Sequence, residues 1–399
     1  MKNIFLVVGL VGLSFSTLYS GSFEDFKQQQ NSGVEKEKKT FEKHKKSELA
    51  AYKKYQEDIN KAYGDYKSEV AKYWQDPKMS TKKEWVSYSK DQKTRTSVDF
   101  EKEVVTIETL ATSAKDATSK LKMLLAKVTT ETVGQAEKDD VLIQKIAKID
   151  AKSGSLSPKT ENKEPLLAST IFAKPPTAKT VKKYIESKVT PKSVTTSRSK
   201  INNIKVYKVT VKLPRNSMQK RSKLYLNEVK KNAKRWELPM SLIFAIMHTE
   251  SNFNPMAKSH VPAYGLMQLV PWSGGQDSYN FVYKKKIKPS STYLYNAENN
   301  MELGSAYLHM QYFKYMKKIK NPTSRLYCTI AAYNTGAGNV AYAWLGNYNI
   351  YKAAAEINKM SSDQVYKHLI AHLKYDEARH YLKKVNAKMD QYHKLYGDI

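Results

Sequence analysis

The chain has 399 residues, of which 41% are hydrophobic, enough for two or three domains with sizeable cores. Its formal net charge of +30 indicates an anionic environment, which is nucleic acid, an acidic membrane surface or an acidic polymer. Cys328 is the only cysteine, which excludes an internal disulfide and any cysteine-based metal site. HExxH, P-loop and GxGxxG motifs are absent, so we expect neither a metal nor a cofactor.

Residues 1–20 have the pattern of a secretory signal peptide. Lys2 precedes an apolar run from Ile4 to Phe15, and small and polar residues follow up to Ser20. The run is short for a membrane span, although an uncleaved anchor remains an alternative. Cysteine is absent near residue 20, so we expect no lipid there. An exported, periplasmic protein meets little nucleic acid, so the positive charge should face the cell wall or, weakly, a membrane surface.

Residues 21–79 are rich in Lys, Glu, Gln and Tyr and predict one charged helical segment. Apolar residues recur at spacings of three and four, which indicates a helix with a single apolar seam. A coiled coil or a helical hairpin would show the same pattern, but a solvated stalk that packs one face on the next domain is favoured. The seam residues are Tyr52, Tyr55, Ile59, Ala62, Tyr66, Val70 and Tyr73.

Residues 80–213 predict a small α+β domain. The runs 97–100 and 104–107 flank a charged turn and indicate a β-hairpin, and residues 207–213 alternate as in a half-buried strand. Two helices are expected, one around Leu121–Val128 and one over Thr180–Lys188. The first should present Leu121, Met123, Leu124, Leu125 and Val128 as its apolar positions. No residue in this domain suggests catalysis, so a rigid spacer or a wall-binding module is the default interpretation.

Residues 214–399 read as successive helices separated by Gly and Pro. The expected helices cover Arg221–Trp236, Met240–Thr249, Glu302–Lys317, Ser324–Tyr333, Tyr351–Ile357, Ser362–Leu373 and Glu377–Tyr392. The predicted fold class is therefore mainly α, with a helical domain preceded by a small α+β domain and an N-terminal helical stalk.

The helix over Met240–Thr249 predicts an acid at its C-terminal end. Pro239 suits the helix start and Pro255 disfavours helix just before it, so the helix should stop close to Glu250. We expect a short amphipathic helix whose apolar row leads to this acid. Apolar neighbours and the negative end of the helix dipole would both raise the pKa of Glu250, as a proton donor requires. An ordinary exposed Glu is the alternative. The row comprises Ile243, Ile246 and Met247.

Three further short pieces suit recognition of a sugar polymer. Gly265 would let the backbone pass close to a ring, Met267 would form a flexible apolar wall, and Gln268 offers both a donor and an acceptor. Tyr333 and Asn334 end a helix and could reach a cleft, and Tyr381, in the run EARHYLKKV, could hydrogen-bond the acid or the substrate. Each residue taken alone could instead be a turn Gly, a core Met, a capping Asn or a packed Tyr.

In this order and spacing the set resembles the family-one lytic transglycosylases, which have a goose-type lysozyme-like helical fold. The run NPTSRLYCTIAAYNTGAGNV and the stretch from Trp85 through IETLA to the strand at Tyr207 extend the likeness to the N-terminal domain of a membrane-bound member, over roughly residues 80 to 395. Two departures are the missing lipid-carrying cysteine and the additional segment 21–76.

The resemblance implies cleavage of the β-1,4 bond between N-acetylmuramic acid and N-acetylglucosamine in peptidoglycan glycan strands. The reaction uses no water and leaves a 1,6-anhydro end, with Glu250 as acid and then base. Tyr381 matches the tyrosine beside the acid, and Ser251 belongs to the Glu-Ser motif that shapes the helix end. Ser259 matches a serine near the reacting sugars. Met267, Gln268, Tyr333 and Asn334 match the substrate cleft. The expected substrate-binding residues are these four together with Ser251, Ser259 and Gly265.

Two rival functions remain at this point. A hydrolytic lysozyme on the same fold would leave reducing ends, and a non-catalytic scaffold would bind murein through its basic faces. The export signal argues against nucleic-acid binding. We expect the basic surface to add salt-sensitive attraction to anionic wall polymers and little specificity. The sequence does not determine the oligomeric state.

Overall fold

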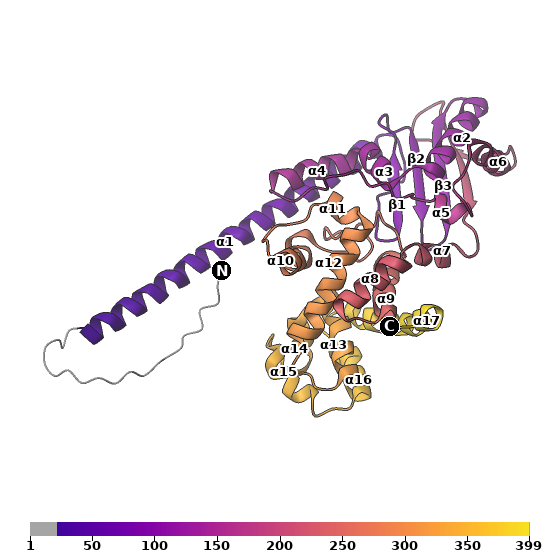
Figure 1. Ribbon diagram of the computed structural model, residues 1–399. Coiled ribbons are helices and arrows are strands. Elements are labelled where there is room, and N and C mark those ends of the chain that lie inside the picture. The colour runs from indigo at the N-terminus through magenta and orange to yellow at the C-terminus, as the bar shows by residue number, and fades with distance from the viewer. Residues whose placement is uncertain (1–21, 399) are drawn as a thin grey trace. The chain divides into compact units, whose positions relative to one another are not determined.

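The computed structural model describes residues 22–398 and is mainly helical (Figure 1). The signal peptide expected over residues 1–20 lies outside the described residues. The chain divides into two compact units between Lys54 and Tyr55, a boundary that falls inside helix α1 (Ser22–Ala71). In the part that the structure describes, no helix is both long and apolar enough to cross a membrane.

Helix α1 is continuous from Ser22 to Ala71, so the hairpin alternative is wrong. From Tyr55 onward its seam residues Tyr55, Ile59, Tyr66 and Val70 are buried. The Tyr66 ring packs edge-on against Tyr88, with ring centroids 6.2 Å apart. This part of the helix therefore packs one face on the domain that follows it.

The α+β domain is built on a five-stranded antiparallel sheet with strand order β1-β2-β3-β5-β4 (Figure 1). The predicted hairpin is confirmed: β2 and β3 pair with Asp99 opposite Val104. The alternating strand is confirmed as β5. The outer strands β1 and β4 were not anticipated, and β4 is exposed along its length, so it carries no alternation. The strands are β1 Glu84–Tyr88, β2 Thr94–Asp99, β3 Val104–Ala111, β4 Thr195–Arg198 and β5 Lys205–Lys212.

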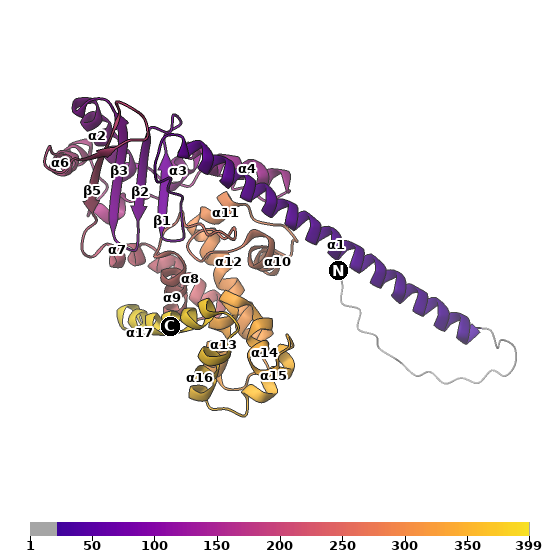
Figure 2. The ribbon, with the colours of Figure 1, turned by 180° about the vertical axis from the view of Figure 1, so that it is seen from behind.

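Helices α2 (Ala114–Thr130) and α6 (Ala178–Lys188) agree with the expected helices of this domain (Figure 2). The side of α2 that faces the sheet buries Leu121, Leu125 and Val128. Met123 was expected among the apolar positions but is 62% exposed, because it lies on the opposite side of the helix. Helices α3 (Val133–Asp139), α4 (Val141–Lys152) and α5 (Ala168–Ile171) were not predicted.

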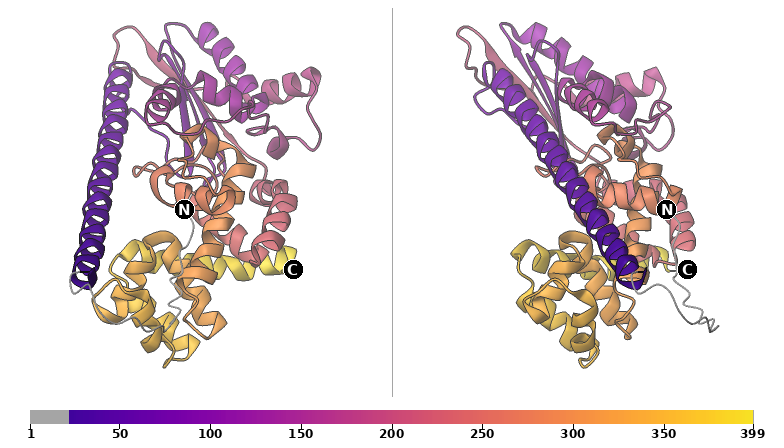
Figure 3. Two further views of the ribbon diagram at one scale, coloured as in Figure 1. Left: turned by 60° about the vertical axis from the view of Figure 1, so that its left-hand side comes forward. Right: turned by 90° about the vertical axis from the view of Figure 1, so that its left-hand side faces the viewer.

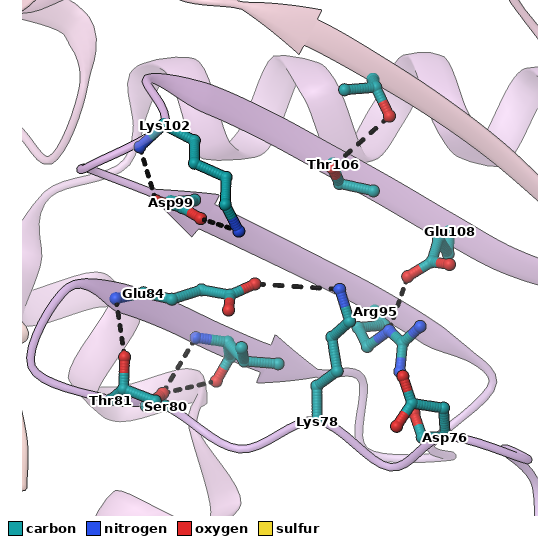
Figure 4. A network of polar contacts seen from close by, with 12 residues as sticks. Asp76, Lys78, Ser80, Thr81, Glu84, Arg95, Asp99, Lys102, Thr106 and Glu108 are labelled. Carbon is teal, nitrogen blue, oxygen red and sulfur yellow. Dashed lines mark hydrogen bonds and ion pairs between the residues drawn. The ribbon is translucent and has the colours of Figure 1, made fainter.

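The loop before β1 is fixed by side-chain hydrogen bonds (Figure 4). The Ser80 hydroxyl accepts from the Val86 N–H at 2.9 Å and donates to the Val86 carbonyl at 3.1 Å. The Thr81 hydroxyl accepts from the Glu84 N–H at 3.0 Å. Residues 80–83 therefore hold a defined position against the first strand.

The remaining residues form the expected helical domain, although helices α10, α11 and α14 were not predicted and two predicted helices are not continuous α-helices. The helix predicted over Arg221–Trp236 is interrupted at Tyr225, and the one predicted over Glu302–Lys317 changes to a wider π-helical turn at Met310. The helices are α7 Ser217–Leu224, α8 Leu226–Trp236, α9 Met240–Ser251, α10 Gln276–Tyr283, α11 Ser291–Tyr295, α12 Ala297–His309, α13 Pro322–Thr335, α14 Ala337–Leu345, α15 Ile350–Ile357, α16 Ser362–His372 and α17 Asp376–Tyr396, with π-helical turns η1 Pro271–Gly275 and η2 Met310–Tyr315.

Helix α9 lies at the centre of the helical core. Every residue from Met240 to Met247 is buried, so the prediction of an amphipathic helix is wrong. A helix that is apolar all round is one that other elements surround. Helix α17 packs along it, and the Phe244 ring contacts the rings of Tyr392 (5.1 Å between centroids) and Tyr396 (4.8 Å). Figure 3 shows the purple strands of the sheet with their helices at the top and the yellow C-terminal helices below them.

Candidate active site

Glu250 is the second-last residue of α9. The helix ends because Asn252 adopts a left-handed conformation, with φ 52°, and its N–H donates to the His248 carbonyl at 3.1 Å. Glu250 is only 5% exposed, so the alternative of an ordinary exposed Glu is wrong. The last turn of a buried helix therefore presents a single carboxyl group that is almost entirely removed from water.

Burial raises the pKa of Glu250, and the neighbouring charges act in both directions. The ammonium of Lys82 and the hydroxyl of Tyr381 lower this pKa, whereas the carboxylate of Glu377 raises it. The Lys82 Nζ donates to Glu250 Oε2 at 3.4 Å and lies 3.8 Å from Glu377 Oε1. The raised pKa agrees with the sequence-based expectation and its apolar cause. The lysine, which comes from the α+β domain, was not anticipated.

Two tyrosines from different helices flank the carboxyl group. Tyr381 on α17 is buried, and its hydroxyl lacks a hydrogen-bond partner of normal geometry among the described residues. Burial and the Glu250 charge together hold the pKa of Tyr381 well above its usual value. Tyr333 on α13 donates to the Met267 carbonyl at 2.8 Å, and the same two causes raise its pKa. Both phenols therefore stay protonated, and the Tyr381 hydroxyl lies close enough to Glu250 to donate to its carboxyl group.

The Gly265–Gln268 turn requires a glycine at its first position. Gly265 has φ +76°, and a Cβ there would lie 2.2 Å from the Leu294 carbonyl oxygen and 2.4 Å from Asn300 Nδ2. Asn300 is fully buried, donates to the Tyr264 and Leu294 carbonyls at 2.9 Å, and accepts from the Met267 N–H at 2.7 Å. Sequence reasoning missed Asn300. Asn300 precedes the helix predicted from Glu302, whereas α12 begins at Ala297, so no signal in the sequence pointed to it.

Met267 and Gln268 differ in what they offer to a ligand. The Met267 side chain is fully buried against Gly304, so the expected apolar wall is instead part of the core, and only its carbonyl meets Tyr333. Gln268 has φ +50°, and its Nε2 donates to the Gly265 carbonyl at 3.0 Å. Its buried Oε1 lacks a partner within the described residues. This oxygen can therefore accept a hydrogen bond from a ligand.

Ser251, expected at the substrate, is a connecting residue. Its side chain is fully buried, and its hydroxyl contacts the Met247 carbonyl at 2.9 Å and the Leu266 carbonyl at 2.8 Å. This bridge joins the end of α9 to the turn at Gly265. The structure thus brings Glu250, the turn and both tyrosines together.

Ser259 and Asn334 are more accessible. Ser259 is half-buried in the loop between Lys258 and Tyr264, where its hydroxyl donates to the Val261 carbonyl. Its hydrogen bonds in the described part of the chain stay within that loop. Asn334 is half-buried next to Tyr333, one residue before the last residue of α13. Of the two, only Asn334 lies on a helix that carries another residue of the site, because α13 also carries Tyr333.

A hollow of about 430 Å³ lies in the α+β domain, between the first two strands and α2 and α3. Trp85, Thr96, Leu124 and Glu131 are among the residues that line it. None of the predicted site residues lines this hollow. It is therefore separate from the Glu250 site.

Comparison with known proteins yields two family models. Residues 227–357 match the transglycosylase SLT domain, and residues 52–151 match the N-terminal domain of membrane-bound lytic murein transglycosylase C. The first match includes Glu250, the Gly265 turn and Asn334 but ends before Glu377 and Tyr381. The second match includes Lys82.

Individual relatives carry the same name. Membrane-bound lytic murein transglycosylase C of Klebsiella pneumoniae is 33% identical over 310 residues, which is 77% of this chain and 81% of that protein. The protein of that name from Sodalis glossinidius is 44% identical over 190 residues, 47% of this chain, and the alignment spans about half (52%) of the relative. The 70 kDa soluble lytic transglycosylase of Escherichia coli covers 46% of this chain and 26% of its own, at 25% identity and a TM-score of 0.34.

Proposed function

The chain belongs to the membrane-bound lytic murein transglycosylase C family of peptidoglycan-cleaving lyases, and from this premise we propose that Glu250 is its catalytic acid and base. The expected family and the mainly helical, lysozyme-like fold class are confirmed by the same matches. The proposed substrate is the β-1,4 bond between N-acetylmuramic acid and N-acetylglucosamine. The proposed product is a 1,6-anhydro-N-acetylmuramic acid end.

The observation that carries the proposal is the buried Glu250 carboxyl at the end of α9. Because burial raises its pKa, the carboxyl can hold a proton that a free Glu would have lost. In the first step this proton passes to the glycosidic oxygen as the bond to the anomeric carbon breaks. In the second step the muramoyl 6-hydroxyl attacks that carbon, and its proton returns to Glu250.

A single carboxylate is sufficient for this sequence. Most glycosidases use a second carboxylate as nucleophile or to activate water. Here the nucleophile belongs to the substrate, and holding it close to the reacting carbon can contribute on the order of 7–11 kcal/mol. The other carboxylate near the site, Glu377, is 76% exposed and contacts Lys82, so we assign it no role as a nucleophile.

The neighbouring residues support binding roles around the acid. We assign Tyr381 to hydrogen bonding with Glu250 or the substrate, because its buried hydroxyl can donate and lies beside the Glu250 carboxyl. Gln268 Oε1 suits a sugar hydroxyl or an acetamido N–H, and Asn334 would contact the same strand. Ser251 and Met267 hold the site from behind, and we place Ser259 at the edge of the substrate. The proposed location is the periplasm, consistent with relatives named as membrane-bound.

The test is Glu250→Gln in the purified protein, assayed by solubilisation of murein and mass analysis of the products. Removing a general acid that acts in both steps should lower the rate by about 10²–10⁴-fold. The control is Glu237→Gln, which makes the same substitution at an exposed position just before α9 and should leave the rate unchanged.

The products separate the rival functions. Anhydro ends are lighter than reducing ends by one water, so anhydro products that disappear in Glu250→Gln support the proposal. Reducing ends from the wild type would indicate a hydrolytic lysozyme. Equal solubilisation by wild type and Glu250→Gln would leave a murein-binding scaffold as the better interpretation.

A further inference from the structure

The loop that carries Lys82 is held against the segment that follows the catalytic helix. The Lys258 N–H donates to the Thr81 carbonyl at 3.3 Å, and the Asn254 side-chain amide donates to the Lys82 carbonyl at 3.3 Å. Asn254 is fully buried and lies four residues after Glu250. On its other side the same loop is fixed to β1 by Ser80, as Figure 4 shows. Both ends of this short loop are thus anchored.

From this position the Lys82 ammonium lies between two carboxylates. It is 3.4 Å from Glu250 Oε2 and 3.8 Å from Glu377 Oε1. The Glu250 side chain is 6% exposed, that of Lys82 36%, and that of Glu377 76%. The order is therefore a buried acid, a partly exposed cation and an exposed anion. Lys82 and Glu250 are 168 residues apart in the sequence, and the domain packing brings them together.

We propose that Lys82 is a positioning residue of the active site, through which the N-terminal domain controls how readily Glu250 releases and regains its proton. Glu377 shares the ammonium and moderates its effect. This inference rests on the proposed role of Glu250 and adds a residue from outside the catalytic domain to the reaction.

The proposal follows from which form of Glu250 each neighbour favours. Lys82, Glu377, Tyr381 and Tyr333 are the titratable groups that face this carboxyl. The ammonium stabilises the carboxylate that forms when the leaving oxygen takes the proton, which makes Glu250 a better acid. Unopposed, the same attraction would ionise Glu250 before the substrate binds. The negative charge of Glu377 and burial act against that loss.

The experiment compares pH profiles of kcat/KM for full-length variants on soluble glycan strands. The reaction requires protonated Glu250, so activity falls on the basic side as Glu250 ionises. In Lys82→Met the burial penalty is less opposed, and this basic limb should move to higher pH by about one unit. Lys82→Arg keeps the charge and should keep the wild-type limb.

Two further variants make the test specific. Lys83→Met removes the same charge one residue away, where the ammonium contacts Glu101, and should leave the limb in place. Glu377→Gln removes the negative charge, so that the Lys82 ammonium interacts with the Glu250 carboxylate alone. Its basic limb should therefore move to lower pH, opposite in sign to Lys82→Met.

An unchanged limb in a folded Lys82→Met protein would overturn the inference, while the proposed function would stand as long as Glu250→Gln is inactive. A raised KM with the limb unchanged would also overturn it, because Lys82 would then bind substrate only. If thermal melting shows that Lys82→Met does not fold, Glu377→Gln decides. A limb at lower pH supports the inference, and an unmoved limb overturns it.

Discussion

Buried polar side chains that bond to backbone atoms hold the Glu250 carboxyl in place. The Ser251 hydroxyl reaches the Leu266 carbonyl at 2.8 Å, and Asn300 holds the Met267 N–H at 2.7 Å. A buried polar group that loses its hydrogen-bond partner destabilises the folded protein, so each of these contacts fixes the segment that it holds. The position of the acid therefore depends on residues that are themselves fully buried.

We expect Gly265→Ala to damage this arrangement severely. The new Cβ would lie 2.2 Å from the Leu294 carbonyl oxygen, and φ +76° is unfavourable for Ala. Thermal melting should show a clear drop in Tm, and murein solubilisation should fall with it.

The matched control is Gly154→Ala. Gly154 has a similar φ of +72° but no atom within 4 Å of an added Cβ, so only the backbone cost of about 1–2 kcal/mol applies. Equal losses in the two variants would mean that close packing at the turn contributes nothing.

At the scale of the element, a buried acid on the short helix α3 makes the stability of the protein depend on pH. Helix α3 begins with a capping box formed by Thr132 and Gln135, and it buries Glu137, whose Oε1 is without a partner in the described part of the chain. Burial, together with the charge of Glu161, raises the pKa of Glu137 to about 8. The folded protein thus retains a proton that the unfolded chain releases near pH 4.5.

Between about pH 4.5 and 8 this carboxyl should make the protein less stable as the pH rises. The unfolded chain binds fewer protons there, and above about pH 8 the destabilisation is complete. Glu137→Gln removes the ionisable group, so its Tm should exceed that of the wild type by about 3 °C or more at pH 8.5. At pH 4 the two should be nearly equal.

Exposed Glu186 on α6 provides the control, and Glu186→Gln should show no gain that grows with pH. A constant difference between Glu137→Gln and the wild type across the whole pH range would contradict the assignment.

On the scale of the molecule, one hydrophobic cluster joins the sheet domain to the helical domain. It includes Trp85 and Leu121 from the sheet domain and Met256, Tyr264 and Leu294 from the helical domain. Because this core is continuous, the N-terminal domain is not an independent spacer. The shared core provides the rigid connection that the Lys82 contact requires.

The C-terminal part of α1 should be indispensable to this unit. Its Tyr55 hydroxyl donates to Asp150 at 2.9 Å, and Asp150 accepts from the Ser291 hydroxyl at 2.6 Å. A protein that starts at residue 52 should melt like the chain that starts at residue 21. One that starts at residue 75 loses four buried seam residues and should melt at least about 5 °C lower. Equal melting temperatures for all three would show that the helix is only a stalk.

Periodicity predicted most of the elements correctly, and its failures have physical causes. The strand at 205–212 and helix α2 were predicted because one face of each is buried and the other is exposed to solvent. Helix α9 was predicted, but its burial on all sides was not. A helix that is buried all round has no polar face, so its pattern does not show which side packs on the core. Strand β4 has no buried face at all.

The sequence alone determined the chemical groups: the acid at 250, the glycine turn at 265, and the tyrosines at 333 and 381. Their types and order along the chain are local properties that motifs record. Only the tertiary structure decided that Met267 faces the core, that Asn300 holds the turn, and that Lys82 reaches Glu250. Electrostatic and packing interactions depend on distance in space, and a contact across 168 residues leaves no periodic trace in the chain.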